Sequence, residues 1–424
     1  MTTTAPPGVT IDDIEQARAA LAGRVRVTPM WPSPVLEAVL GVPVLLKCEQ
    51  MQLTGSFKIR GALNFVRQLS EADAGRGLIA ASAGNHAQGV AMAGASRDIR
   101  VTVVMPVSAP LAKLNATREL GARVISHGSS LEEARNEAQA IAARDGSLYV
   151  PPFDDDAIIA GQGSLGLELL EQAPDVREVL IPAGGGGLLA GVATAIKARR
   201  PDVRVVGVQA AAMNGICQSF ARHAVVAIPH QRTIADGVAV AGPSERTFAL
   251  IERHVDAMVS VSDEAIAHAI VMLIEKSKMI VEGAGALAVA ALHSGAYRPG
   301  GPTVAVLSGG NIDINLVGSI VRRGLVDAGR YRHLAVEVSD TPGELAMVAQ
   351  AVADAGGNIL EVDHNRDAPG MPVGVAVLEL LIEVNGEAHF RAVVRMLRER
   401  GLRGVPRSAA RLATDDARRR HAPS

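Results

Sequence analysis

The sequence is poor in the residues that mark several classes of protein. Aromatic residues make up only 2% of its 424 residues, which argues against a protein that stacks single-stranded nucleic acid. The 42 Lys and Arg stand against 44 Asp and Glu, so a broad electrostatic hold on phosphate backbones is not expected. There is no uninterrupted apolar run of about 18 residues that would span a membrane. We therefore expect neither a nucleic-acid partner nor a membrane partner.

Cysteine is scarce as well. Cys48 and Cys217 are the only two, too few for a disulfide framework, and neither lies in a metal-binding motif. The first residues, MTTTAPPGVTIDDIEQ, lack the basic and then apolar order of a secretory signal. At 424 residues, 48% of them hydrophobic, the chain is too long for one ordinary core. We expect a soluble, cytoplasmic, multidomain α/β protein.

Short β-branched runs alternate with Ala-rich helical stretches from about residue 40 to 325. Near-continuous apolar strands separated by helices predict βαβ units in a parallel sheet with helices on both faces. The expected strands are 43–48, 77–81, 100–105, 123–127, 176–182, 204–209 and 303–308. The expected helices are 61–69, 109–120, 131–145, 187–200 and 263–276.

The pattern changes from residue 333 onward. Apolar alternation predicts a strand at 333–338, and helical spacing follows at 345–353. Two more strands are expected at 357–364 and 373–384, then a helix at 390–397 and a short strand near Leu402. This βαββαβ order predicts a ferredoxin-like unit. The expected domains are 1–330 and 331–407, with a connector at 327–332 and a polar tail at 408–424.

A glycine run follows one expected strand and opens a helix: Ile181-Pro-Ala-Gly-Gly-Gly-Gly-Leu. Its glycines, Gly184, Gly185, Gly186 and Gly187, let the backbone approach a ligand, and the positive end of the helix favours an anion such as phosphate. A dinucleotide is disfavoured because the position of the acidic ribose partner falls near Gln209, and the Gly-Lys-Ser/Thr ending of an ATP site is absent. A merely structural turn stays an alternative.

Lys58 is one of only six lysines among the 42 cations. It starts a helix between Phe57 and Ile59, and both the helix start and the apolar neighbours disfavour an ammonium. A neutral amine is what a Schiff base needs, although an exposed helical lysine is the plainer interpretation. A lysine of this kind together with a phosphate site points to pyridoxal 5′-phosphate as cofactor.

Two further motifs end expected strands. In Ala81-Ser-Ala-Gly-Asn-His-Ala-Gln-Gly, backbone N–H groups at a helix start suit a substrate carboxylate, and Asn85 suits the cofactor's ring hydroxyl. His86 is either a catalytic base or, as we favour, a residue that packs the loop. In Leu307-Ser-Gly-Gly-Asn, Ser308 lies where α/β ligand sites collect and suits the pyridine nitrogen.

In combination these motifs resemble those of the serine/threonine dehydratases, the threonine ammonia-lyase group of fold type II pyridoxal phosphate enzymes. The resemblance runs from about Val25 to Val321. It implies a two-lobed α/β fold with parallel and mixed sheets, like that of tryptophan synthase β, with a small lobe at about 55–155, in a homo-oligomer (dimer or tetramer).

The resemblance also implies a role for each matching residue. Lys58 would form the Schiff base and act as catalytic base, and Phe57 and Asn85 would line the ring. Gly184–Gly187 would bind phosphate, Gly237 would contact the ring through its backbone, and Ser308 would sit at the ring nitrogen. The substrate carboxylate would be held by Ser82, Ala83, Gly84, Asn85 and His86.

The implied reaction is α,β-elimination of L-threonine to 2-oxobutanoate and ammonia, and of L-serine to pyruvate, a step toward isoleucine or in threonine breakdown. Ala83 replaces a serine that the related serine racemases carry, which favours elimination. Gln209 stands where members with a divalent cation carry glutamate, so we expect no metal. The alternatives are a serine/threonine racemase, a β-replacement enzyme such as cysteine synthase, and an amino-acid sensor with an idle catalytic domain.

The C-terminal unit resembles an ACT domain, a small-molecule sensor that usually pairs with a copy of itself. The matching segments are Asp340-Thr-Pro-Gly-Glu-Leu and Gly357-Asn-Ile. An amino-acid effector would meet backbone N–H groups at the helix start, polar groups for its ammonium and apolar groups for a branched side chain. The expected effector residues are Asp340, Gly343, Glu344, Leu345, Asn358 and Ile359. A dimerisation module without a ligand stays an alternative.

Overall fold

The structure is a computed structural model that describes residues 8–366 and 372–407. The chain divides into two units, Met1–Leu316 and Val317–Ser424, and each is described by itself. The division falls inside helix α14 (Ile314–Asp327), whereas the sequence predicted a connector at 327–332. The assignment of 1–330 and 331–407 as functional domains stays a prediction, and the expected polar tail at 408–424 lies outside the described residues.

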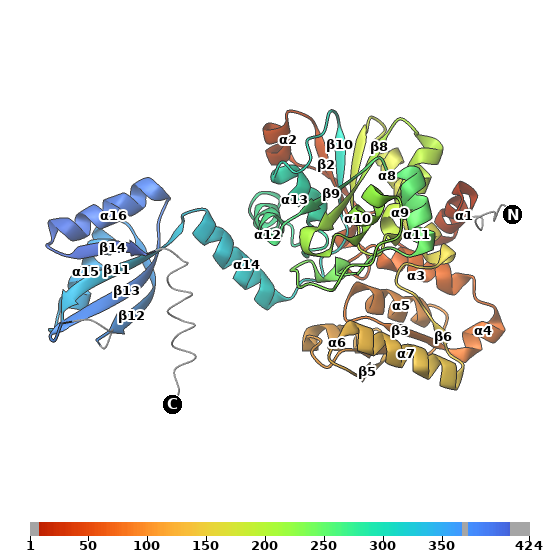
Figure 1. Cartoon of the computed structure of the whole chain (residues 1–424), viewed down its shortest axis with the longest axis horizontal. Coiled ribbons are helices and arrows are strands. Elements are labelled where there is room, and N and C mark those ends of the chain that lie inside the picture. Colours follow the sequence, from red (N-terminus) through yellow and green to blue (C-terminus); the bar gives the residue numbers. More distant parts are fainter. Residues whose placement is uncertain (1–7, 367–371, 408–424) are drawn as a thin grey trace. The chain divides into compact units, whose positions relative to one another are not determined.

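The larger sheet of the first unit has the strand order β1-β2-β10-β7-β8-β9 (Figure 1). All neighbours pair in parallel except β1, which is antiparallel to β2. Every residue of β7 and β10 is buried, as expected for strands covered by helices on both faces. The strands are β1 Met30–Pro32, β2 Val44–Cys48, β7 Glu178–Pro182, β8 Arg204–Ala210, β9 Ala257–Val261 and β10 Thr303–Leu307. The helices of this lobe are α1 Ile11–Leu21, α2 Pro34–Leu40, α8 Asp156–Gln172, α9 Gly187–Arg199, α10 Gly215–Arg222, α11 Glu245–His254, α12 Asp263–Met272 and α13 Leu287–His293.

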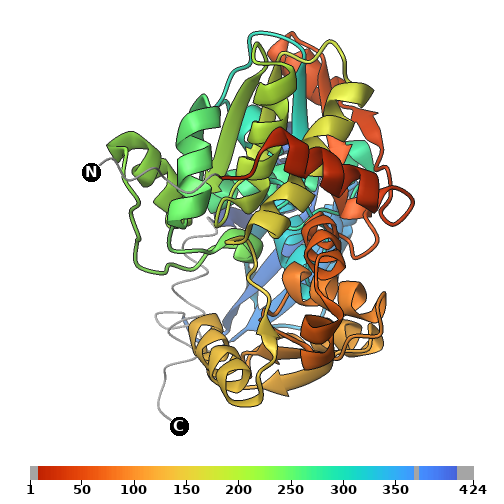
Figure 2. The same ribbon diagram turned by 90° about the vertical axis from the view of Figure 1, so that its right-hand side faces the viewer.

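The smaller sheet is parallel throughout, in the order β5-β4-β3-β6. It falls within the small lobe expected at about 55–155, and both views show the two sheets as separate parts of the first unit (Figures 1 and 2). Its strands are β3 Leu78–Ala81, β4 Val101–Met105, β5 Arg123–Ser126 and β6 Leu148–Tyr149. Its helices are α3 Lys58–Arg67, α4 Glu71–Arg76, α5 Asn85–Ala95, α6 Leu111–Glu119 and α7 Leu131–Asp145.

Glycines allow three helices of the first unit to cross closely. A Cβ on Gly161 of α8 would lie 2.6 Å from the Cα of Gly61 in α3, and a Cβ on Gly191 of α9 would lie 2.7 Å from the backbone nitrogen of Gly163 in α8. Side chains cannot be added at such contacts without moving the backbone. Helix α3, which begins at Lys58, is therefore held tightly against the helix that covers the larger sheet.

The second unit contains the antiparallel sheet β12-β13-β11-β14 with two helices. Leu334, Val336 and Val338 are buried on one side of β11, as the alternating pattern predicted. The elements are β11 Tyr331–Ser339, α15 Glu344–Asp354, β12 Asn358–Asn365, β13 Val375–Glu383, α16 Glu387–Glu399 and β14 Arg403–Arg407. The predicted βαββαβ order and the predicted α/β fold class are confirmed. Among the described residues, no helix is long and apolar enough to cross a bilayer.

Candidate active site

Lys58 is the first residue of α3, and the backbone fixes its position from both sides. The N–H of Phe57, which precedes it, donates to the Ser308 carbonyl (3.1 Å). The Lys58 Nζ donates to the Pro152 carbonyl (2.8 Å) and lies 5.2 Å from the centroid of the Phe57 ring. Burial lowers the pKa of Lys58 to about 8, although the negative charge of Glu282 opposes this. A fraction of Lys58 therefore carries the expected neutral amine near neutral pH.

The glycine run connects β7 to α9. Gly186 has a φ of 95°, a conformation that side chains disfavour. A Cβ on Gly185 would overlap the ring of Phe153, and one on Gly187 would lie 2.9 Å from the Cβ of Phe153. The first turn of α9 has no acidic residue and no side chain caps it. The N–H groups at this helix start therefore have no side-chain cap and can meet an anion.

Some helices of the first unit begin with a side-chain cap, and others, among them the helices of the two motifs, do not. Hydroxyl groups cap five helices: α1 through Thr10, α4 through Ser70, α7 through Ser130, α11 through Ser244 and α12 through Ser262. Helices α5 and α9 instead begin after glycine and have no side-chain cap and no acid in the first turn. These are the two helices for which the sequence predicted a carboxylate and a phosphate.

The predicted motifs meet in space although they are far apart in the chain. The N–H of Gly310 donates to the Gly55 carbonyl (2.9 Å), which joins the serine-glycine loop to the lysine motif. Asn311 Nδ2 donates to Asn85 Oδ1 and to the Thr54 carbonyl (2.9 Å). A Cβ on Gly184 would lie 3.1 Å from the Cα of Val238, the residue after Gly237. The structure therefore brings Phe57, Lys58, Asn85, Gly184–Gly187, Gly237 and Ser308 together, while their individual roles stay predictions.

The loop from Ser82 to His86 turns from β3 into α5. The Ser82 hydroxyl accepts from the N–H of Gly84 (3.1 Å), which shapes the turn. His86 is buried, and its Nε2 lies 2.9 Å from the Val150 carbonyl. Burial lowers the pKa of His86 to about 3, so the ring is neutral and Nε2 donates to that carbonyl. These contacts favour the packing role for the His86 ring over a catalytic base.

Two neighbours of the site were not predicted from the sequence. Phe153 packs against the glycine run, and the residue before it, Pro152, accepts the hydrogen bond of Lys58. Glu282 is buried and accepts from Asn85 Nδ2 (2.6 Å). The only signal for Glu282 is a lone acid between an apolar run and Gly-Ala-Gly-Ala. Buried carboxylates are rare unless they are paired.

The expected effector residues do not form one site within a single chain. Asp340 follows Ser339, which pairs with Val375, whereas Asn358 pairs with Glu383 at the other end of β13. Eight residues of strand separate the two positions, roughly 26 Å. Gly343, Glu344 and Leu345 lie with Asp340 at the start of α15, and Ile359 lies with Asn358. Asp340 is also bonded to Arg366 (2.9 Å), so the expectation that Asp340 and Asn358 share one ammonium is wrong for one chain.

Neither cysteine has the surroundings of a reactive thiol or a metal ligand. Burial raises the pKa of Cys48 to about 11 and that of Cys217 to about 12. Gln209 is buried, and its Oε1 accepts from the N–H of Cys217 (2.8 Å). Within residues 8–366 and 372–407, no group of three or more His, Cys, Asp or Glu side chains could hold a metal ion.

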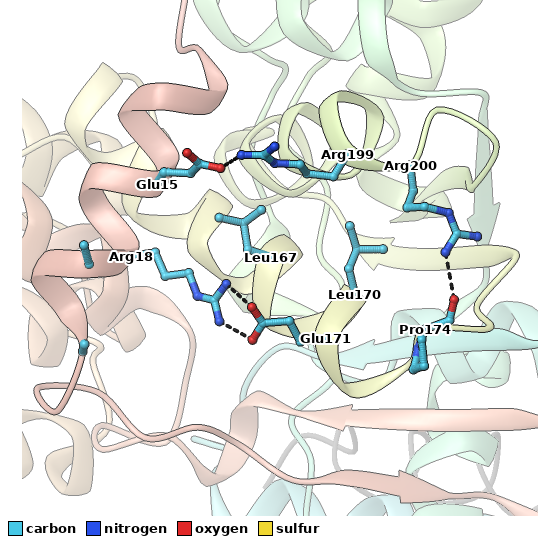
Figure 3. Close-up of a pocket in the computed structure, with 10 residues that line it drawn as sticks. Glu15, Arg18, Leu167, Leu170, Glu171, Pro174, Arg199 and Arg200 are labelled. Atoms are coloured by element: carbon cyan, nitrogen blue, oxygen red, sulfur yellow. Dashed lines mark hydrogen bonds and ion pairs between the residues drawn. The ribbon is translucent and has the colours of Figure 1, made fainter.

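A groove lies over α1, α8 and α9, and none of the motif residues lines it. Figure 3 shows the side chains that do. Its arginines are paired: Arg18 with Glu171, Arg199 with Glu15, and Arg200 with Asp202. Arg199 and Arg200 lie at the C-terminal end of α9, the opposite end from the glycine run. The described residues that line the groove therefore present no free cation, and the groove does not join the candidate active site.

Residues 21–309 match the model of a family described as pyridoxal-phosphate dependent enzyme, and this is the class to which the chain belongs. A lysine with a lowered pKa, a glycine run that a Cβ would obstruct and an uncapped helix start all fit pyridoxal phosphate.

The relatives narrow the class further. The L-threonine ammonia-lyase of Thermotoga maritima is 44% identical over 93% of this chain and 98% of that protein. The crystal structure of the T.th. threonine deaminase has 40% identity and a TM-score of 0.68, covering 72% of this chain and 99% of that one. The maize serine racemase structure has 32% identity and a TM-score of 0.71, covering 76% and 99%. Within the class, the chain belongs to the family of the L-threonine ammonia-lyases.

Proposed function

We propose that the protein converts L-threonine to 2-oxobutanoate and ammonia by α,β-elimination, and L-serine to pyruvate in the same way. The observation that carries the proposal is the position of Lys58. Its amine has a pKa lowered to about 8 and donates to the carbonyl of Pro152, the residue before Phe153, which packs on the glycine run. The relationship to L-threonine ammonia-lyases over nearly the whole chain supports this substrate class.

Bound pyridoxal phosphate supplies the electron sink that makes the Cα proton of an amino acid acidic. The N–H groups of Gly184–Gly187 and of the start of α9 hold the phosphate. The uncapped start of α5, with the Ser82–Asn85 loop, holds the substrate carboxylate. Lys58 then removes the Cα proton with its neutral amine, since burial disfavours the ammonium. Ser308, which is buried and uncharged, is the residue we assign to the pyridine nitrogen.

A racemase is the second candidate because the maize serine racemase shares this fold at 32% identity. Racemisation needs a proton donor on the face of Cα opposite Lys58, and Ala83 offers no hydroxyl at the position we assign to that face. An assay of keto acid formation with L-Thr, L-Ser, D-Thr and D-Ser, followed by chiral analysis of the remaining amino acid, separates the two. We expect keto acid from the L-isomers alone. Inversion faster than keto acid release would favour the racemase.

We further propose that the second unit is an ACT-type regulatory domain, in a cytoplasmic homo-oligomer. The loop before α15 supports this, because the helix begins after Gly343 without a side-chain cap and could meet an effector carboxylate. Since Asn358 and Ile359 lie at the far end of the sheet, they would join such a site only from a second copy of the chain. The domain would then sense an amino acid across an interface between copies.

Truncation after Arg330 tests the regulatory proposal. The full-length protein should respond to a branched-chain amino acid with a change in half-saturation, of about 5–150-fold at most. The truncated protein should stay active and lose that response. If calorimetry and kinetics of the full-length protein detect no effect of any non-substrate amino acid, the second unit acts in assembly only.

A further inference from the structure

Glu282 is a buried carboxylate that the reaction outlined above does not use. It is 4% exposed and precedes Gly283, in the segment between the π-helical turn η4 (Leu273–Ser277) and α13. Its N–H donates to the Gly309 carbonyl (3.1 Å), and a Cβ on Gly309 would overlap its Oε1. The absence of a side chain at Gly309 therefore leaves room for this carboxylate beside the Ser308 loop.

Hydrogen bonds determine which way the Asn85 amide faces. Asn311 Nδ2 donates to the Thr54 carbonyl, so it is a donor in its contact with Asn85 as well. The Asn85 atom in that contact must then be Oδ1, and the amide nitrogen must point to Glu282 Oε1, 2.6 Å away. An amide nitrogen has two N–H groups, so one remains for a ligand. Glu282 thus holds Asn85 with its donor in the position expected for the ring hydroxyl.

Charged groups from several elements influence Glu282. Lys58 of α3 and Lys113 of α6 attract it, whereas Asp236 of η3 (Asp236–Val238) repels it. Lys113 is itself paired with Asp236 (2.9 Å). Burial, followed by Asp236, raises the pKa of Glu282 to about 7, while the hydrogen bond from Asn85 opposes the rise. The carboxylate therefore changes charge close to neutral pH, and its charge interacts with that of the Lys58 amine.

We propose that Glu282 is a positioning residue whose ionised form fixes the Asn85 amide as a donor toward the cofactor ring and raises the proton affinity of Lys58. Protonation of Glu282 weakens both effects. The link to Lys58 is reciprocal, since the charge of Glu282 also opposes the lowering of the Lys58 pKa. This inference rests on the proposed function only for its activity readout.

Competitive amine labelling of the cofactor-free full-length chain tests the link to Lys58 without cofactor or substrate. The Lys58 side chain is partly exposed, so acetic anhydride can reach it, and mass spectrometry follows its acetylation against pH with Lys276 as internal reference. In Glu282→Gln the Lys58 midpoint should fall by about half a pH unit or more, because the anion that favours the ammonium is gone. This result does not depend on whether the protein acts on L-threonine.

The holoenzyme supplies the second readout. In the wild type, kcat/KM should fall about fivefold between pH 7 and pH 6 as Glu282, with a pKa of about 7, gains a proton. In Glu282→Gln the highest value of kcat/KM should be lower, and its decrease toward acid pH (the acid limb) should disappear. Glu282→Asp should restore part of this decrease. In Asn85→Ala the acid limb should move to higher pH, since Asn85 lowers the pKa of Glu282. This last variant keeps the test valid if Glu282→Gln does not fold.

Glu178→Gln is the matched control. Glu178 is a buried carboxylate that accepts from the N–H of Gly300 (2.6 Å) and from the Tyr297 hydroxyl. It begins β7, at the opposite end of that strand from the glycine run. This variant should leave the Lys58 midpoint and the acid limb unchanged. The proposal is overturned if Glu282→Gln moves neither of them, or if Glu178→Gln moves both equally.

Discussion

Two amines of the first unit have opposite surroundings. Lys47 of β2 donates to Glu168 Oε1 (2.5 Å), Gln172 Oε1 (2.6 Å) and the Thr28 carbonyl (2.8 Å), which uses all three of its donors. Lys58 donates to a single carbonyl, that of Pro152. Both belong to a chain with only six lysines, so rarity alone does not distinguish them. An amine whose donors are all taken serves the fold, whereas one with donors to spare can react.

The surroundings of Lys47 form a buried ion cluster that reaches the helix of Lys58. Arg60, two residues after Lys58 in α3, pairs with Glu49 (2.8 Å) and with Glu168 (2.9 Å). Although burial alone would raise it, Arg60 holds the pKa of Glu49 below its usual range. Two cations and two anions thus connect β2, α3 and α8. The unreactive cluster holds in place the helix that carries the reactive amine.

The largest expected effect separates the two amines by chemistry. Lys58→Ala should lower turnover of L-threonine by at least about 10³-fold, because one residue supplies both the Schiff-base amine and the base. The chain should fold, since Lys58 is not part of the ion cluster. The cofactor should still associate through the glycine run but without an absorbance band near 410–420 nm, which is about where a protonated Schiff base absorbs. More than a trace of keto acid would make Lys58 the wrong lysine.

Lys47→Met should have the opposite profile. It should lower the free energy of unfolding by about 3 kcal/mol, since it removes one cation from a buried cluster while Arg60 still pairs with Glu168. Urea unfolding measures this loss, and the folded fraction should keep its turnover within about threefold. Lys197→Met is the control, because its pair with Asp256 is partly exposed and worth about 1 kcal/mol or less. If Lys47→Met is fully folded but has lost its turnover, Lys47 belongs to the active site.

The fold was predictable where local and tertiary preferences agree. Helix α7 has the predicted bounds, Leu131–Asp145, because it is capped by Ser130 and ends at Gly146. Helix α8 was missed since Gly161, Gly163 and Gly166 disfavour a helix locally. Those glycines are needed where α3 and α9 cross it. A sequence pattern alone does not show that a neighbouring helix occupies the space where the side chain of a glycine would lie.

The candidate site likewise has a part that the sequence predicts and a part that it does not. Lys58 and Gly184–Gly187 carry local signals, namely a rare lysine at a helix start and a glycine run after a strand. Glu282 gains its role only from Asn85, which lies 197 positions away along the chain. The effector residues do not form one site within a single chain because the strand register, which the sequence does not specify, separates Asp340 from Asn358.

The smallest effect concerns the rate at which cofactor is loaded. An ordinary lysine has a pKa of about 10.4, so its neutral fraction rises about tenfold per pH unit up to that value. Burial lowers the pKa of Lys58 to about 8, so the neutral amine should accumulate up to pH 8 and then level off. Stopped-flow absorbance of the cofactor-free chain mixed with pyridoxal phosphate should show this plateau, and Lys47→Met should leave its midpoint in place. A rate that still climbs beyond pH 9 would mean that the surroundings of Lys58 do not favour its neutral form, and the contrast between the two lysines would rest on hydrogen bonding alone.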